Sequence, residues 1–273
     1  MIKIQNLDVY YPTHHALKNI TLTLDPGQVY GLIGANGSGK STLFKSIMGL
    51  IKPTNGSIRI NNKGVDDAIK ASVLAYVPQT ETVDWHFPVS VYDVVMMGRY
   101  AYMGLMRTPR KADHAAVIQA LETVDMLAYQ DRQIDALSGG QKKRVFVARA
   151  LAQNTQIMLL DEPFTGVDVT TEALLGQLFK TLANQGRLLI VSTHNLGSVP
   201  QFCQSVILLN QHIIAAGPVK TTFTPAYLRQ AFGGNLRHHY IDATDIHHDK
   251  DDRGLTVLTD DEKALIFYGT DIT

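Results

Sequence analysis

The stretch "GANGSGKS", residues 34–41, is the most informative part of the chain. Two glycines separated by four residues, then a lysine and a hydroxyl residue, form the P-loop pattern. Glycine lets backbone N–H groups converge on phosphate oxygens, and a helix that begins here adds its dipole. We expect Lys40 to reach the β- and γ-phosphates of a nucleotide and Ser41 to bind Mg²⁺. The predicted phosphate-binding residues are Gly34, Ala35, Asn36, Gly37, Ser38, Gly39, Lys40, Ser41 and Thr42.

The residues around this loop provide the context that the pattern requires. An apolar run, "QVYGLI", precedes it, and Leu43, Ile47 and Leu50 follow it at helical spacing. Further along, "QIMLLDEP" and "RLLIVSTH" are continuous apolar runs that end in polar residues. Such runs are typical of strands that are buried on both faces of a parallel sheet. The alternation of strands, loops and helices therefore predicts an α/β P-loop fold.

Other segments differ in character from this core. Alternating residues in the first 33 positions predict an antiparallel β subdomain. A block rich in Met, Ala and Tyr predicts an inserted helical subdomain at about residues 88–137. The runs "LTVLT" and "ALIFYG" near the end look like a β-hairpin. We therefore expect a nucleotide-binding domain over residues 1–235 and a short C-terminal extension over residues 236–273.

Composition limits the functions that need to be considered. The 273 residues carry 25 basic and 25 acidic side chains, so a general affinity for nucleic acid is not expected. The one cysteine, Cys203, rules out a disulfide framework and indicates a reducing compartment. We expect Cys203 to be a small buried residue. No apolar run approaches about 18 residues, so a partner would have to span any membrane at which the chain works.

A pair of acidic residues supports the nucleotide site. Asp161 and Glu162 lie just beyond the end of an apolar strand, in "IMLLDEP". In P-loop proteins an Asp at a strand end holds the magnesium ion. The neighbouring Glu can then orient or deprotonate an attacking water.

The string "LSGGQKKRVFVARALAQ", residues 137–153, resembles the signature motif of ABC-transporter ATPase subunits. The rest of the chain follows the motif order of that family. The resemblance covers roughly residues 1–235, in this order: the P-loop, Gln79, the signature, Asp161 with Glu162, a "TGVD" loop and His194.

The resemblance implies a role for each matching position. It makes Glu162, His194 and Gln79 the catalytic residues, and Ser41, Gln79 and Asp161 the Mg²⁺ ligands. Tyr11 is similar to the aromatic residue that stacks on adenine, and Tyr10 is the alternative because alternation turns only one of them inward. The family usually has Ser-Ala-Leu-Asp where this chain has residues 165–168, "TGVD", and Asp168 is retained. We therefore expect this loop to cross to a partner subunit.

The signature motif also predicts a second anion-binding helix end. Ser138, Gly139, Gly140 and Gln141 precede a helix that we expect over Lys142 to Ala152. In the family that this chain resembles, the signature of one subunit closes over ATP bound to the other. The resemblance thus implies a head-to-tail homodimer with two ATP molecules at its interface.

The segment after Gln79 narrows the type of ABC protein. "VPQTETVDWHFPVSVYDVVMMGRY", residues 77–100, resembles ATPase subunits of metal-chelate uptake systems. It is most similar to the manganese and iron branch and less similar to the zinc branch at Asp84, Trp85 and Phe87. This implies a peripheral subunit at the cytoplasmic face of the membrane that contacts a permease through residues 80–105. An extracytoplasmic metal-binding protein would be an indirect partner. A zinc-uptake ATPase and a non-transport assembly scaffold remain alternatives.

The tail at residues 238–252 is rich in histidine and aspartate. Four histidines lie among several aspartates here, namely His238, His239, His247 and His248. Imidazole and carboxylate groups together are suitable ligands for Mn²⁺, Zn²⁺ or Fe²⁺. Adjacent histidines point apart in an extended chain, however, and the two doublets form no i,i+4 pair. This pattern favours a solvated acidic loop over a metal site.

Overall fold

The structure is a computed structural model that describes residues 1–79, 88–104, 106–233, 237–241, 255–259 and 264–268. The chain forms two compact units. The first, which we call the P-loop unit, contains residues 2–24, 29–59 and 192–273. The second, which we call the helical unit, contains residue 1 and residues 25–28 and 60–191. No helix among the described residues is long and apolar enough to cross a membrane.

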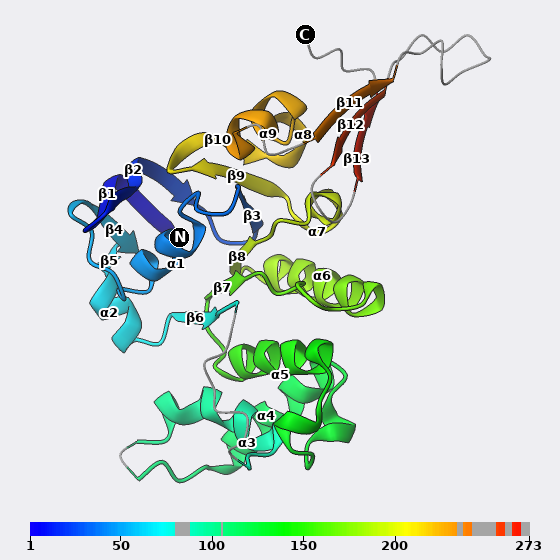
Figure 1. Cartoon of the computed structure of the whole chain (residues 1–273). Coiled ribbons are helices and arrows are strands. Elements are labelled where there is room, and N and C mark those ends of the chain that lie inside the picture. Colours follow the sequence, from blue (N-terminus) through cyan, green and yellow to red (C-terminus); the bar gives the residue numbers. More distant parts are fainter. Residues whose placement is uncertain (80–87, 105, 234–236, 242–254, 260–263, 269–273) are drawn as a thin grey trace. The chain divides into compact units, whose positions relative to one another are not determined.

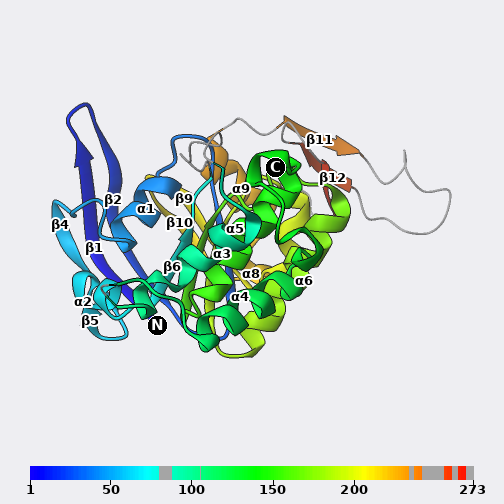
Figure 2. The ribbon, with the colours of Figure 1, turned by 90° about the horizontal axis from the view of Figure 1, so that it is seen from below.

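A long antiparallel hairpin begins the P-loop unit (Figure 2). Its strands are β1 (Ile2–Tyr11) and β2 (His14–Leu24), and β4 (Asn55–Ile60) lies beside β1. The register shifts on both sides of Leu7. Asn6 and Asn19 have left-handed backbones there, and their side-chain amides are hydrogen-bonded at 3.0 Å. Asparagine tolerates this conformation better than most residues, so it suits a bulge.

The strand before the P-loop is buried along its whole length. β3 (Val29–Ile33) is fully buried and pairs in parallel with β9 (Ser205–Asn210), which pairs antiparallel with β10 (His212–Pro218). Apolar residues fill each of these positions in β3 except Gly31, as expected for a strand that is covered on both faces.

The helix after the P-loop is shorter than its sequence pattern predicts. α1 (Lys40–Ile47) buries Leu43 and Ile47 as expected, but Leu50 lies outside it and is 67% exposed. Gly49 is left-handed, and Leu50 N donates to Lys45 O at 2.8 Å. This arrangement ends a helix at glycine, which explains why Leu50 leaves the apolar face.

The rest of the P-loop unit consists of short helices and a terminal sheet. Cys203 is buried, as predicted, and burial raises the pKa of its thiol. The C-terminal extension has three antiparallel strands rather than two, because residues 237–241 pair with residues 255–259. The remaining elements of the unit are η4 (Leu196–Ser198), α7 (Val199–Phe202), α8 (Val219–Thr222), α9 (Pro225–Phe232), β11 (Arg237–Ile241), β12 (Leu255–Thr259) and β13 (Ala264–Tyr268).

The helical unit has its own buried strands. β6 (Leu74–Val77) pairs in parallel with β7 (Ile157–Asp161), and β8 (Leu188–Ser192) lies on the other side of β7. Every residue of β7 and β8 is buried, which agrees with the two continuous apolar runs in the sequence. The unit also contains β5 (Lys63–Gly64), α2 (Val65–Lys70) and α6 (Val169–Asn184).

Residues 88–104 and 106–152 form a helical cluster in this unit (Figure 1). A buried ion pair joins two of its elements, because Arg99 Nε donates to Asp113 Oδ1 at 2.9 Å. The hydrogen bond from Arg110 N and the contact with Arg99 lower the pKa of Asp113. Arg99 Nη1 also donates to Ala152 O at 2.9 Å. The elements of the cluster are α3 (Val91–Met96), η1 (Met97–Tyr102), α4 (Lys111–Thr123), η2 (Leu127–Tyr129), η3 (Ile134–Ala136) and α5 (Gly139–Ala152).

Candidate functional site

The P-loop is a turn that only glycine can form at two of its positions. Gly39 has a φ of +102°, and a Cβ there would lie 2.6 Å from Leu17 Cδ2. Gly34 has no unusual φ, but its Cβ would lie 2.1 Å from Leu209 O. Both distances are shorter than real side chains adopt, so the backbone passes closer to its neighbours than any other residue allows. Exposed N–H groups in such a turn can surround a phosphate.

Polar side chains line the inside of this turn. Lys40 is 7% exposed, and its ammonium donates to Gly34 O at 2.6 Å and to Ala35 O at 3.0 Å. Ser38 is 3% exposed, and its hydroxyl has no hydrogen-bond partner within the described chain. A buried hydroxyl without a partner is costly unless a ligand binds it. The loop therefore has side-chain donors that suit a phosphate group.

The structure separates the two tyrosines proposed as the adenine-stacking residue. Tyr11 reaches the start of α1, since its hydroxyl lies 3.5 Å from Thr42 Oγ1, and its ring stacks on His14. Tyr10 is 53% exposed and stacks instead on His15, with ring centroids 3.8 Å apart. Of the two rings, only that of Tyr11 contacts the P-loop helix.

His194 lies in the loop after β8 and is half-buried. This loop is fixed beside the end of β3, because Thr193 N donates to Leu32 O at 3.3 Å. Thr193 Oγ1 then accepts from Asn195 N at 3.0 Å. The P-loop begins two residues after Leu32. His194 is therefore held near the segment that enters the phosphate-binding turn.

In the helical unit, two of the predicted catalytic residues are in direct contact. Gln79 Nε2 donates to Glu162 Oε2 at 2.6 Å, and Thr165 Oγ1 donates to the same oxygen at 3.1 Å. Glu162 is 8% exposed and has a φ of +50°. A left-handed backbone at a non-glycine residue is uncommon and is frequent at functional sites. Asp161 is 4% exposed and accepts from the Tyr76 hydroxyl at 3.3 Å.

The signature motif caps its own helix. Ser138 Oγ accepts from Gln141 N at 3.3 Å, and Gln141 Oε1 accepts from Ser138 N at 3.0 Å. α5 consequently begins at Gly139, so the predicted start at Lys142 is wrong. The Ser-x-x-Gln spacing is a capping box, which is a signal already present in the sequence and sufficient to place this boundary.

The "TGVD" loop lies against the signature motif within the same unit. A Cβ on Gly140 would lie 3.7 Å from Asp168 Oδ2, and one on Gly139 would lie 3.8 Å from Gly166 O. Asp168 caps α6 by accepting from Thr171 N at 2.9 Å. The hydrogen bonds from Thr171 lower the pKa of Asp168, so its carboxylate is held in the ionised form.

One residue of this region was not predicted from the sequence. Lys143, on the first turns of α5, donates from Nζ to Gln79 O at 2.7 Å. It therefore joins the signature helix to the glutamine that contacts Glu162. The sequence contains two adjacent lysines, Lys142 and Lys143, and no local pattern identifies the one that makes this contact.

Several predicted residues lie outside the described part of the chain. These include Asp84, Trp85 and Phe87, together with His247 and His248 in the tail. His238 and His239 belong to β11, in register with Leu258 and Val257, but their side chains are not described. Among the side chains that are described, no three His, Cys, Asp or Glu residues form a metal-binding group.

Comparison with known proteins identifies the class. Residues 17–165, more than half of the chain, match the family model of the ABC transporter. The chain is 54% identical to the chelated iron transport system membrane protein YfeB of Yersinia pestis, over 97% of this chain and 90% of that protein. It is 52% identical to the manganese transport system ATP-binding protein MntA of a Synechocystis strain, over 85% and 90% of the two chains. The chain therefore belongs to the ABC transporter family.

Solved structures agree with this assignment. A metal-chelate type ABC transporter in an inward-facing conformation matches with a TM-score of 0.77 and 26% identity, over 98% of this chain and 97% of that chain. A dimeric ATP-binding cassette in a post-hydrolysis state, bound to ADP and Pi, matches with a TM-score of 0.71 and 27% identity, over 80% and 99%. These matches confirm the predicted P-loop α/β fold and the prediction of a nucleotide-binding ATPase.

The two tyrosines can be tested as adenine-binding residues. Stacking on a base contributes about 1–3 kcal/mol, so Tyr11→Ala should weaken ATP binding roughly tenfold to a hundredfold. Tyr11→Phe should retain most of the affinity, since the ring remains. Tyr10→Ala is the matched control and should change the dissociation constant less than about twofold. Calorimetric titration with ATP measures all three; a loss in Tyr10→Ala alone would assign adenine stacking to Tyr10.

Proposed function

We propose that this protein is the ATP-hydrolysing subunit of an importer for a divalent transition metal, manganese or iron. The observation that carries the proposal is the combination of the phosphate-binding turn with 54% identity, over nearly the whole chain, to a subunit named for chelated iron transport. The relative at 52% identity is named for manganese transport. The resemblance of residues 77–100 to the manganese and iron branch points to the same substrates.

In this proposal the chain's residues divide the work of ATP hydrolysis. Backbone N–H groups of residues 34–42 and the ammonium of Lys40 hold the phosphates. Ser41, Gln79 and Asp161 would hold Mg²⁺ through the oxygen ligands that it prefers, and the ion would neutralise charge on the phosphates. Glu162 accepts a proton from the attacking water, and His194 contacts the γ-phosphate.

The contact between Gln79 and Glu162 supports these roles. A carboxylate that accepts two hydrogen bonds, from Gln79 and Thr165, is fixed in one orientation. A general base must be oriented in this way to accept a proton efficiently. Because Lys143 holds the Gln79 carbonyl, movement of α5 would also move the residue that orients the base.

We further propose that two copies of the chain act as a head-to-tail dimer. Ser138, Gly139, Gly140 and Gln141 form the start of α5, where backbone N–H groups and the helix dipole favour an anion. This set would contact the γ-phosphate of ATP bound to the partner subunit. Asp168, beside Gly140, would cross the same interface. The dimeric cassette with ADP and Pi among the structural matches supports this arrangement.

The proposed contact with a permease lies at residues 80–105. Residues 80–87 are outside the described part of the chain, but the residues that follow include several large hydrophobic side chains that are exposed to solvent. Met97, Tyr100 and Tyr102 are 37–42% exposed, and the adjacent Met106 is 89% exposed. A local group of exposed aromatic and methionine side chains is typical of a protein interface. The proposed location is the cytoplasmic face of the membrane, with an extracytoplasmic metal-binding protein as an indirect partner.

The roles of Glu162 and of the dimer can be tested together. Glu162→Gln keeps an oxygen that can accept from Gln79 but removes the basic carboxylate. We expect turnover to fall at least about a hundredfold, while ATP binding persists. Because the dimer opens only after hydrolysis, this variant should elute as a dimer in the presence of ATP during size-exclusion chromatography. Glu122→Gln, an exposed carboxylate on α4, is the matched control.

Two results would contradict the composite site. One is a variant that remains monomeric with ATP and still hydrolyses it at the wild-type rate. The other is a Glu122→Gln variant that behaves like Glu162→Gln, because the effect would then be unrelated to the proposed base.

The transported metal can be tested in cells that contain the permease and the metal-binding protein. Cells with the wild-type chain should accumulate radioactive Mn²⁺. Cells with Lys40→Ala should not, because the phosphates of ATP lose the ammonium group that binds them. Unlabelled Fe²⁺ should compete more strongly than Zn²⁺. Uptake that is unchanged in Lys40→Ala would remove the manganese assignment. Strong competition by Zn²⁺ and none by Fe²⁺ would favour a zinc-uptake ATPase.

A further inference from the structure

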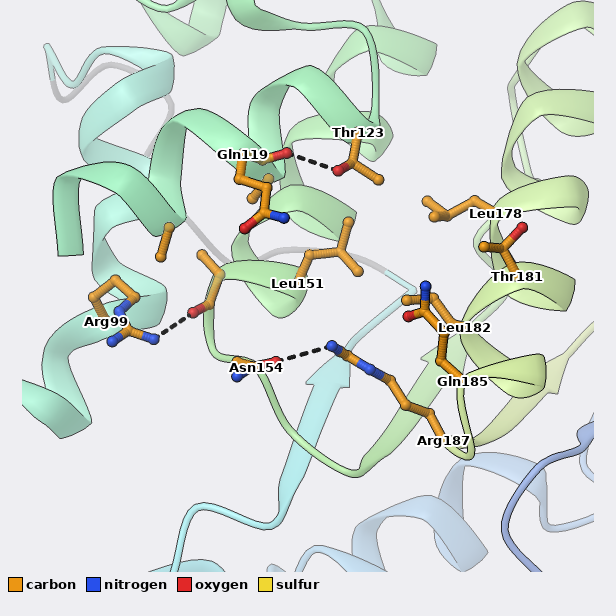
Figure 3. A pocket seen from close by; sticks show the side chains of 13 residues that line it. Arg99, Gln119, Thr123, Leu151, Asn154, Leu178, Thr181, Leu182, Gln185 and Arg187 are labelled. Atoms are coloured by element: carbon orange, nitrogen blue, oxygen red, sulfur yellow. Dashed lines mark hydrogen bonds between the residues drawn. The ribbon is translucent and has the colours of Figure 1, made fainter. Parts of the chain in front are cut away.

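A cavity of about 410 Å³ lies within the helical unit (Figure 3). Its walls come from η1, α4, the last residues of α5, the last turns of α6 and the segment that follows α6. None of the proposed nucleotide-binding or catalytic residues lines it. Pockets for small molecules have volumes of roughly 300–1,000 Å³. The space is therefore large enough for a small organic molecule.

The charge of the cavity wall is unbalanced. The lining includes two guanidinium groups, Arg99 and Arg187, and no carboxylate. Arg99 is neutralised from outside the cavity by Asp113, at 2.9 Å. Arg187 makes no ion pair within the described chain. Among the described residues, the cavity wall thus carries a cation, Arg187, that has no counterion.

Arg187 also has an unused hydrogen-bond donor. Its Nη2 donates to Asn154 Oδ1 at 2.9 Å, as Figure 3 shows. Its Nη1 is buried and has no partner within the described chain. Burial lowers the pKa of Arg187, which is the expected effect of removing a cation from water without an anion beside it. An anionic ligand would supply both the missing counterion of Arg187 and an acceptor for its unused donor.

Two neutral amides also line the cavity. Figure 3 shows the amide of Gln119 pointing into the space from α4, and that of Gln185 pointing into it from the end of α6. The Thr123 hydroxyl already donates to Gln119 O at 2.7 Å. The available donors are therefore the two amides and Arg187 Nη1, a set that suits carboxylate or phosphate oxygens.

The helix ends at this cavity do not exclude an anion. The C-terminal end of a helix carries partial negative charge on its free carbonyls. At the end of α5, however, Ala152 O accepts from Arg99 Nη1 at 2.9 Å. At the end of α6, Leu182 O accepts from Arg187 N at 3.2 Å and Ala183 O accepts from Gly186 N at 2.8 Å. These carbonyls are satisfied, so the uncompensated charge in the cavity is the positive charge of Arg187.

We propose that this cavity is a binding site for a small organic anion. Carboxylate or phosphate oxygens of the ligand accept hydrogen bonds from Arg187 Nη1 and from the amides of Gln119 and Gln185. The ligand joins α4 to the ends of α5 and α6, the two helices whose first residues carry the signature motif and Asp168. The site is independent of the proposed metal substrate.

The test uses calorimetric titration of the full chain in Mg²⁺-free buffer, with tricarballylate and inorganic phosphate as probes. Tricarballylate tests for a carboxylate ligand, and phosphate tests for a phosphate ligand. Because phosphate also suits the P-loop, each titration is repeated with Lys40→Ala. We expect one binding event per chain that persists in Lys40→Ala. Arg187→Gln should weaken it at least about tenfold, since a charge-assisted hydrogen bond is lost.

A second variant tests the cavity without relying on the fold of Arg187→Gln. Gln119→Glu places a carboxylate on the wall that faces Arg187. It should raise the melting temperature and abolish binding of both probes, because the new carboxylate acts as an internal counterion. Ala115→Glu adds the same charge to an exposed position one turn earlier on α4, outside the cavity. This control should change neither the melting temperature nor the binding of the two probes.

Three results would overturn the proposal. The first is the absence of binding heat with both probes. The second is binding that is unchanged in both Arg187→Gln and Gln119→Glu. The third is binding that disappears in Lys40→Ala, because the anion would then occupy the P-loop.

Discussion

The close approach of the backbone at Gly34 and Gly39 is the constraint on which the rest of the site depends. Gly39 lies against Leu17 of β2, and Gly34 lies against Leu209 of β9, with no space for a Cβ at either position. The turn is therefore fixed by strands on two sides, and its N–H groups are oriented before any ligand arrives. A phosphate bound there needs little rearrangement of the protein, which is the usual origin of strong anion binding by such loops.

The helical unit contributes a second set of linked contacts. Lys143 on α5 donates to the Gln79 carbonyl, and the Gln79 amide donates to Glu162. Thr165, at the start of the "TGVD" loop, donates to the same carboxylate. The signature helix, the proposed base and the loop before α6 are therefore connected by direct hydrogen bonds. In the proposed mechanism, this connection lets closure of a partner over the signature motif affect the orientation of Glu162.

Local patterns in the sequence were enough to predict the main parts of the fold and most of the proposed site. The P-loop spacing identified residues 34–41, and continuous apolar runs identified β7 and β8, because both signals lie within a few neighbouring residues. The contact between Gln79 and Glu162 joins residues 83 positions apart, so no local pattern contains it. The contact of Lys143 with Gln79 is likewise tertiary. The same is true of the cavity around Arg187, whose lining residues come from separate elements.

Two predicted helix boundaries were wrong because capping residues, and not apolar periodicity, set them. The signature helix begins at Gly139 because Ser138 and Gln141 form a capping box, and the helix after the P-loop ends before Leu50 because Gly49 is left-handed.

The central claim is that the crowded turn at Gly39 holds the phosphates of ATP, and it is tested most directly by calorimetric ATP titration of Gly39→Ala. The control is Gly27→Ala, which replaces another glycine of positive φ but would place its Cβ 3.8 Å from the nearest atom. Both variants incur backbone strain, and only Gly39→Ala displaces the turn. A hydrogen bond to a charged group contributes about 1.5–3 kcal/mol, and displacing the turn misaligns such donors, so we predict at least about a tenfold loss of affinity in Gly39→Ala and near-wild-type affinity in Gly27→Ala. Wild-type ATP affinity in a folded Gly39→Ala variant would contradict the account.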